Sequence, residues 1–102
     1  MSRPDYVDHK AENGRLVILQ TLQKQLDGRL NSLLIARELQ LWGHDYSREA
    51  VRTQLNRLAE LGAVHLTDLS SHVVVAELTE AGDEHLRRQR VIAGIERPRI
   101  GG

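Results

Sequence analysis

The chain has 102 residues, with 14 basic and 14 acidic side chains, no cysteine, no phenylalanine, one tryptophan and two tyrosines. A chain of this length forms one domain, and its aliphatic residues must build the core. The lack of cysteine excludes disulfides, thiolate nucleophiles and cysteine-ligated metals, and no apolar run approaches the ~20 residues of a membrane span. We therefore expect a single soluble, cytoplasmic domain that has no membrane partner.

The N-terminal part predicts a leader followed by a long helix. Residues 1–9 are polar and contain acidic side chains, unlike a signal peptide, and are predicted to form a flexible leader. The first helix is predicted from about Lys10 to about Asp27, and Gly28 is its expected C-cap. Four leucines recur at helical spacing on its apolar side: Leu16, Leu19, Leu22 and Leu26.

Two further helices are predicted in the middle of the chain. Residues 29–30 are expected to form a short third strand, and Asn31 or Ser32 caps the second helix. The predicted core contacts of this helix are Leu34, Ile35, Leu39 and Trp42. Ser47 caps the third helix, which ends at Gly62. Its buried stripe is predicted to be Val51, Leu55 and Leu58.

A hairpin is predicted after the third helix. Residues 64–69 and 72–78 have the composition of two strands, with Ser70–Ser71 as the tight turn between them. This turn predicts a register in which Leu66 lies opposite Val75.

The last helix completes the predicted domain, which spans residues 10–92. Thr79 caps this helix, and we expect it to run to about Ile92. Residues 93–102 contain a proline and end in two glycines, so they are predicted to form a disordered tail. The order of elements is typical of an α+β winged helix-turn-helix, with a three-helix core, a two-stranded hairpin wing and a C-terminal helix.

The third helix carries side chains that suit DNA recognition. Arginine binds guanine O6 and N7, asparagine pairs with adenine, and threonine contacts a thymine methyl or a phosphate. Free N–H groups at the helix N-terminus also receive phosphate. The predicted contacts to double-stranded DNA are Arg48, Arg52, Thr53, Asn56, Arg57 and His72. A second interpretation stands beside this one, in which these are ordinary solvated side chains in surface ion pairs.

The charge distribution supports an alternative function. Glu49 and Glu60 share the outer helix face with the arginines, and the hairpin tip has no Lys or Arg, whereas DNA binders are usually basic on one face. These features favour a protein-interaction module, for example in a packaging or assembly complex. The arginines between residues 87 and 99 fit a phosphate-binding arm and a solvated tail equally well. A homodimer through the first helix or residues 86–92 is a further hypothesis.

Catalysis and metal binding are not expected. The chain has no glycine-rich phosphate loop and no nucleophile with an evident base, because Ser47 and Thr79 are explained as caps. Asp83 and His85 have ligand-like spacing, but no second His or Cys completes the four ligands that zinc usually requires. We therefore expect neither an enzyme nor a cofactor.

Several segments resemble a known family over nearly the whole chain. They are residues 15–19, 41–44, 51–55, 58–62, 78–83 and 96–98. In these segments the sequence resembles small winged-helix proteins of Mu-like transposable phages and prophages, which are often labelled ArsR-like regulators. The resemblance implies a phage-encoded regulator of transcription in the cytoplasm of a bacterial host. It does not imply metal sensing, because ArsR sensors use Cys-containing or His/Asp/Glu sites and this chain has no cysteine.

Overall fold

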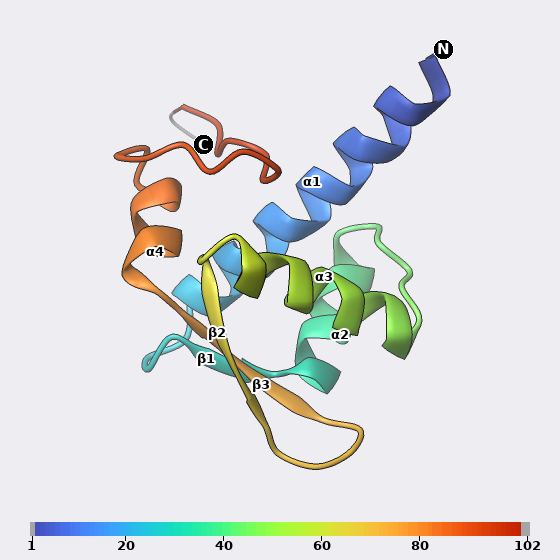
Figure 1. Cartoon of the computed structure of the whole chain (residues 1–102), viewed down its shortest axis with the longest axis vertical. Coiled ribbons are helices and arrows are strands. Elements are labelled where there is room, and N and C mark those ends of the chain that lie inside the picture. Colours follow the sequence, from blue (N-terminus) through green and yellow to red (C-terminus); the bar gives the residue numbers. More distant parts are fainter. Residues whose placement is uncertain (1, 101–102) are drawn as a thin grey trace.

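The computed structural model describes residues 2–100, with side chains from residue 8 onward. Within this range the elements follow in the order α1 (Ser2–Gln23), β1 (Arg29–Asn31), α2 (Ser32–Leu41), α3 (Arg48–Glu60), β2 (Val64–Asp68), β3 (Val74–Leu78) and α4 (Glu80–Leu86) (Figure 1). The strands form one antiparallel sheet in the order β1-β3-β2. The first three helices contact one another, and α4 packs on α1. This arrangement confirms the predicted α+β winged helix, including its short third strand.

A single aliphatic core holds the helices to the sheet. Its largest fully buried aliphatic side chains come from α1, α2, α3 and β3: Ile18, Leu19, Leu22, Ile35, Leu39, Val51, Leu55, Leu58 and Val74. Each such side chain contributes roughly 1.5–3 kcal/mol when it leaves water. The stripe predicted on α3 is confirmed, since all three of its residues are buried.

Side-chain caps set the starts of three helices. The Asn31 carboxamide oxygen accepts from the Leu34 N–H, which selects Asn31 over Ser32 as the cap of α2. The predicted caps of α3 and α4 are also confirmed: Ser47 Oγ accepts from Ala50 N–H and Thr79 Oγ1 accepts from Gly82 N–H. Each cap satisfies a backbone donor that lacks a partner within the helix, typically for about 1 kcal/mol.

The register of the wing differs from the prediction by one residue. Leu66 lies opposite Ala76, where we predicted Val75. The cause is the loop, since residues 69–73 separate the strands and the N–H groups of Leu69 and Ser70 both donate to the Val73 carbonyl. A one-residue slip moves every side chain to the other face of a strand. The longer loop therefore places Leu66 and Ala76 together on the core side.

The start of α4 is pressed against the turn that follows α3. Thr79 Oγ1 donates to the Gly62 carbonyl at 2.7 Å, and the Thr79 N–H donates to the Ala63 carbonyl. A Cβ atom on Gly82 would collide with that same Ala63 carbonyl oxygen. Glycine is therefore required here so that the first turn of α4 can approach the backbone between α3 and β2.

The first helix is displaced from its predicted bounds at both ends. α1 begins at Ser2, where we predicted a flexible leader over residues 1–9, and Figure 1 shows its N-terminal part projecting beyond the rest of the fold. Pro4 does not prevent this extension, because it lies in the first turn, where its missing N–H would have no helical partner. The helix ends at Gln23, before the predicted Asp27. Met1 lies outside the described residues.

The C-terminal segment lies against the domain and replaces much of the predicted disordered tail at 93–102. α4 ends at Leu86, before the predicted Ile92, and the chain turns at Arg88 with φ of 65°. Ile92 and Ile95 are buried in the core cluster, and the Arg15 Nε–H donates to the Gly94 carbonyl at 2.7 Å. Burial of these two isoleucines stabilises the docked position of the segment. Residues 101–102 lie outside the described range.

Hydrogen bonds that involve two buried histidines hold this segment against the rest of the domain. His85 Nδ1 accepts from the Ile92 N–H, so its Nε2–H donates to the Glu96 carbonyl at 2.9 Å. His44 Nε2–H donates to the Asn13 Oδ1, and the Asn13 amide donates to the Glu96 carboxylate at 2.6 Å. The His85 ring therefore connects α4 to the C-terminal segment, and the His44 ring connects the turn between α2 and α3 to Asn13 of α1, which binds Glu96. Among the described side chains, no cluster of three or more His, Asp or Glu could hold a metal ion.

Three side chains predicted in the core are instead exposed: Leu26, Leu34 and Trp42. Leu26 lies beyond the end of α1, in the turn before β1. On α2 the buried side carries Ile35 and Leu39, and Leu34 points away from it. Within residues 2–100, no helix is long and apolar enough to cross a membrane.

Candidate nucleic-acid interface

The outer face of α3 is the candidate interface. Its buried stripe points into the core, so the intervening positions are left at the surface. Four of the predicted contact residues on this helix are exposed: Arg48, Thr53, Asn56 and Arg57. Arg52 is partly covered, with its side chain 40% exposed.

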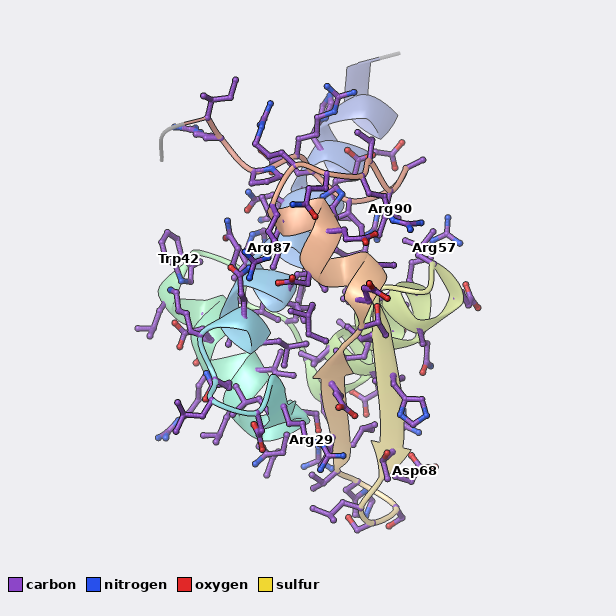
Figure 2. The ribbon with its side chains drawn as sticks, turned by 90° about the vertical axis from the view of Figure 1, so that its left-hand side faces the viewer. Arg29, Trp42, Arg57, Asp68, Arg87 and Arg90 are labelled. Carbon is purple, nitrogen blue, oxygen red and sulfur yellow. The ribbon has the colours of Figure 1, made fainter. Side chains whose placement is uncertain are left out.

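Two of the predicted arginines are already paired with acids. Arg52 Nη2 lies 3.1 Å from Asp68 Oδ1 on β2, which ties the middle of α3 to the wing. Arg57 Nη1 lies 3.4 Å from Glu60 Oε1 one turn along the same helix. Figure 2 shows Arg57 pointing outward near the end of α3 and Asp68 at the far end of β2. Both arginines therefore form surface ion pairs, but only Arg57 pairs within its own helix as the sequence indicated, while Arg52 pairs with the wing.

Three predicted residues from different elements meet at one groove. Arg48, Arg52 and His72 line a groove of about 420 Å³ between the starts of α2 and α3 and the wing loop. Apolar side chains also line it, from α2, α3 and β3: Leu33, Ala36, Val51 and Val74. Thr53, Asn56 and Arg57 are not part of this groove and lie on the rest of the helix.

Arg48 differs from the other arginines of α3 because it makes no ion pair with any described side chain. It is the first residue of a 13-residue helix, where the partial positive charge of the helix and unpartnered N–H groups favour an anion. Thr53 is less available, since its hydroxyl donates to the Glu49 carbonyl of the preceding turn. Arg48 is therefore the side chain of this face with most freedom to contact phosphate.

Comparison with known proteins identifies the family to which this fold belongs. The family model of the ribonuclease R winged-helix domain matches residues 16–86, from the middle of α1 to the end of α4. The chain belongs to this winged-helix family. Winged helices commonly bind nucleic acids, so the family supports a DNA- or RNA-binding fold.

Two relatives share much of the length of this winged helix. The uncharacterized protein gp26 of Escherichia phage Mu is 35% identical over 92 residues, which cover 90% of this chain and 94% of that protein. An uncharacterized protein of Haemophilus influenzae is 36% identical over 69 residues, covering 68% of this chain and 67% of that protein. No solved structure matches the chain. The gp26 protein supports a phage link, and neither relative carries the ArsR-like label.

Three of the five C-terminal arginines of this winged helix make contacts within the domain. Arg87 Nε donates to Asp83 Oδ2 at 2.7 Å, and Arg90 Nε donates to Glu84 Oε1 at 2.8 Å, both beside α4 (Figure 2). Arg88 donates to a backbone carbonyl of the C-terminal segment at 2.6 Å. The hydrogen bonds from Arg87 and Gln23 hold the pKa of Asp83 below its ordinary value. These contacts favour a C-terminal segment that is docked on the domain over a free phosphate-binding arm.

The sequence did not single out Asp68 or the apolar side of the groove. The tertiary structure brings the Asp68 carboxylate to Arg52, 16 residues away in the chain. Leu33 and Ala36 lie three residues apart at the start of α2, and this helical spacing was a usable signal for a shared surface. Their role in the groove depends on the position of the wing, which no local pattern contains.

Proposed function

We propose that this protein binds double-stranded DNA through α3 and acts as a transcriptional regulator of a Mu-like phage or prophage in the host cytoplasm. The observation that carries the proposal is Arg48, an arginine free of any ion pair with the described side chains, at the capped start of α3 beside Arg52 and His72. Membership of a winged-helix family supports it.

In this proposal α3 enters the major groove and the start of the helix lies near the DNA backbone. Arg48 and His72 contact phosphates, while Asn56 and Arg57 reach base edges along the exposed helix face. Arg52 exchanges its Asp68 partner for a phosphate or a guanine. This exchange is energetically accessible, because an exposed ion pair contributes only about 0–1 kcal/mol.

The acidic residues on the same surface lower the affinity for DNA and increase the discrimination between DNA sequences. Glu49, Glu60 and Asp68 repel phosphate, so few counterions are released and non-specific binding is weak. We therefore expect binding that depends on favourable base contacts rather than on general attraction between a basic surface and DNA.

A mobility-shift titration with fragments of the phage's own genome tests the proposal, at low and moderate salt and against unrelated competitor DNA. Arg57→Ala should weaken the selective shift by about 1–3 kcal/mol, as expected for a lost guanine contact. Arg48→Ala should weaken binding to all DNA sequences alike and reduce its salt dependence, as expected for a lost phosphate contact. Asp68→Asn should strengthen the shift, because this change releases Arg52 from its ion pair. Arg29→Ala is the matched control, since Arg29 forms an exposed ion pair with Glu77 at the opposite edge of the sheet.

The outcomes separate the DNA proposal from its alternative. A shift that Arg48→Ala and Arg29→Ala weaken equally would remove α3 as the interface. No shift at low salt with any fragment would reject DNA binding altogether.

A second candidate function is a protein-interaction module in a phage packaging or assembly complex. The apolar lining of the groove and the acids Glu49 and Glu60 on the outer face of α3 favour it. Capture of phage proteins that persists at high salt and fails with Leu33→Glu would support this candidate, because apolar burial is less sensitive to salt than phosphate contacts.

A further inference from the structure

The surface of α2 that faces away from the core is unusually apolar. Leu34, Leu41 and Trp42 are 43%, 79% and 59% exposed, although they lie in or beside the same short helix. Figure 2 shows Trp42 at the outer edge of the molecule, pointing away from the core. Large exposed apolar side chains gathered on one short helix of a small domain indicate a surface that another molecule covers.

Charged residues divide this apolar surface in a regular way. Leu34, Arg37, Glu38 and Leu41 follow the spacing i, i+3, i+4 and i+7, which places them in one line along the helix. All four line a shallow hollow of about 520 Å³ between α2 and the end of α1. Among the side chains that the structure describes, neither Arg37 nor Glu38 has an ion-pair partner.

This line of residues, Leu34–Arg37–Glu38–Leu41, is complementary to itself. When two copies of α2 pack antiparallel about a two-fold axis between residues 37 and 38, Leu34 lies opposite the partner's Leu41. In the same register Arg37 lies opposite the partner's Glu38. A two-fold axis generates every contact twice, so one geometry buries four leucines and pairs four charges.

We propose that this face of α2 is the contact surface of a homodimer, with a second copy of the chain as its occupant. The symmetric order of leucine, two opposite charges and leucine selects a second copy over an unrelated partner. The groove beside α3 stays accessible in this dimer, because Ser32 and Ala36 lie on the side of the helix opposite to Leu34 and Leu41. Leu33, four residues before Arg37, lies at the margin between the two surfaces. The proposal goes beyond nucleic-acid binding and does not depend on it.

One short helix makes a small interface, so the dimer is expected to dissociate on dilution. Sedimentation velocity of the full chain from about 1 μM to about 500 μM should show a concentration-dependent shift from monomer to dimer. Leu41→Glu should abolish the shift, because it places a carboxylate against the partner's Leu34. Leu69→Glu is the matched control, since Leu69 is an exposed leucine on the wing and 67% exposed.

A charge exchange tests the register itself. Arg37→Glu and Glu38→Arg should each weaken the dimer by about tenfold or more, because the two-fold axis places like charges opposite each other at two positions. The double variant carrying both changes should recover most of the wild-type dimer, since each pair is then reversed. Both side chains lie outside the core, so the variants are expected to fold, and circular dichroism checks this directly.

A wild-type chain that stays monomeric up to the highest concentration would overturn the proposal. A dimer that Leu41→Glu and Leu69→Glu weaken equally would also overturn it. Single charge variants that leave the dimer intact, or a double variant that does not recover it, would reject the antiparallel register.

Discussion

The two helices of the helix-turn-helix differ in what they expose. α3 buries three aliphatic side chains and presents Glu49, Thr53 and Asn56 to solvent. α2 also buries aliphatic side chains, including Ile35 and Leu39, yet its outer side presents leucines and is followed by an exposed tryptophan. A polar face is stable in water, whereas an apolar face forgoes up to about 1.5–3 kcal/mol for each large side chain left uncovered. The same local motif therefore carries two surfaces with different physical requirements.

This difference suggests separate roles for the two helices. The outer side of α3 combines hydrogen-bonding groups with Arg48, which has no ion-pair partner among the described side chains, and this combination suits a polar ligand such as DNA. The outer side of α2 carries exposed leucines on either side of Arg37 and Glu38, and it suits an apolar contact with a charge pair at its centre.

The two sides of α2 should respond very differently to the same substitution. Leu39→Ala should lower the free energy of unfolding by about 2–5 kcal/mol, because Leu39 is fully buried. Leu41→Ala should change it by less than about 0.5 kcal/mol in dilute monomer, because Leu41 is exposed. Urea denaturation at low protein concentration measures both values. A large loss with Leu41→Ala in dilute protein would show that its exposure has been misjudged.

The caps of α2 and α3 should make similar contributions. Asn31→Ala and Ser47→Ala should each cost about 1 kcal/mol, since each removes the acceptor of a helix N-terminal N–H. Thermal unfolding followed by circular dichroism measures the loss, with Asn31→Gly and Ser47→Gly as milder controls. An unchanged melting temperature for one alanine variant would show that this helix does not depend on its cap.

Acid should weaken the junction between the two helices. His44 lies in the turn between α2 and α3, and burial followed by the nearby Lys10 charge lowers its pKa, with Glu96 opposing. The folded state therefore binds the proton more weakly than the unfolded chain does. Stability should fall as the pH drops below about 6.5, the ordinary value, until it passes the folded pKa. Denaturation across this range should give a smaller slope for His44→Gln than for His72→Gln, whose ring is exposed.

The ion pair between α3 and the wing should matter least for stability. Arg52 and Asp68 are 40% and 73% exposed, so their coupling free energy should lie below about 1 kcal/mol. A double-mutant cycle with Arg52→Ala and Asp68→Ala measures the coupling, and high salt should reduce it further. A coupling above that value would mean that the pair fixes the position of the wing.

Local patterns predicted much of the fold because local physics controls it. Ser47 and Thr79 were recognised as caps from residue type and position, and the structure confirms both hydrogen bonds. The i, i+4, i+7 stripe of α3 predicted which side of that helix is buried. The same spacing misled at Leu34 and Trp42, because periodicity marks an apolar side but does not say whether the chain itself covers it.

The candidate site was predicted less completely. The exposed positions on α3 followed from the buried stripe, whereas the Arg52–Asp68 pair and the groove near His72 required the placement of the wing. That placement depends on the strand register, and the register predicted from the sequence differs from the observed one by one residue. A short turn and a five-residue loop both fit the local composition, and only packing of the strand face chooses between them.

By itself the sequence determined the order of the elements, the caps of α3 and α4, and the buried side of α3, because these depend on neighbours within one or two helical turns. Tertiary structure alone decided the wing register, the docking of residues 92–96, and the exposure of leucines on α2. Each of these depends on which distant surface a side chain meets. That choice is made by the free energy of the whole packed domain and not by any single segment.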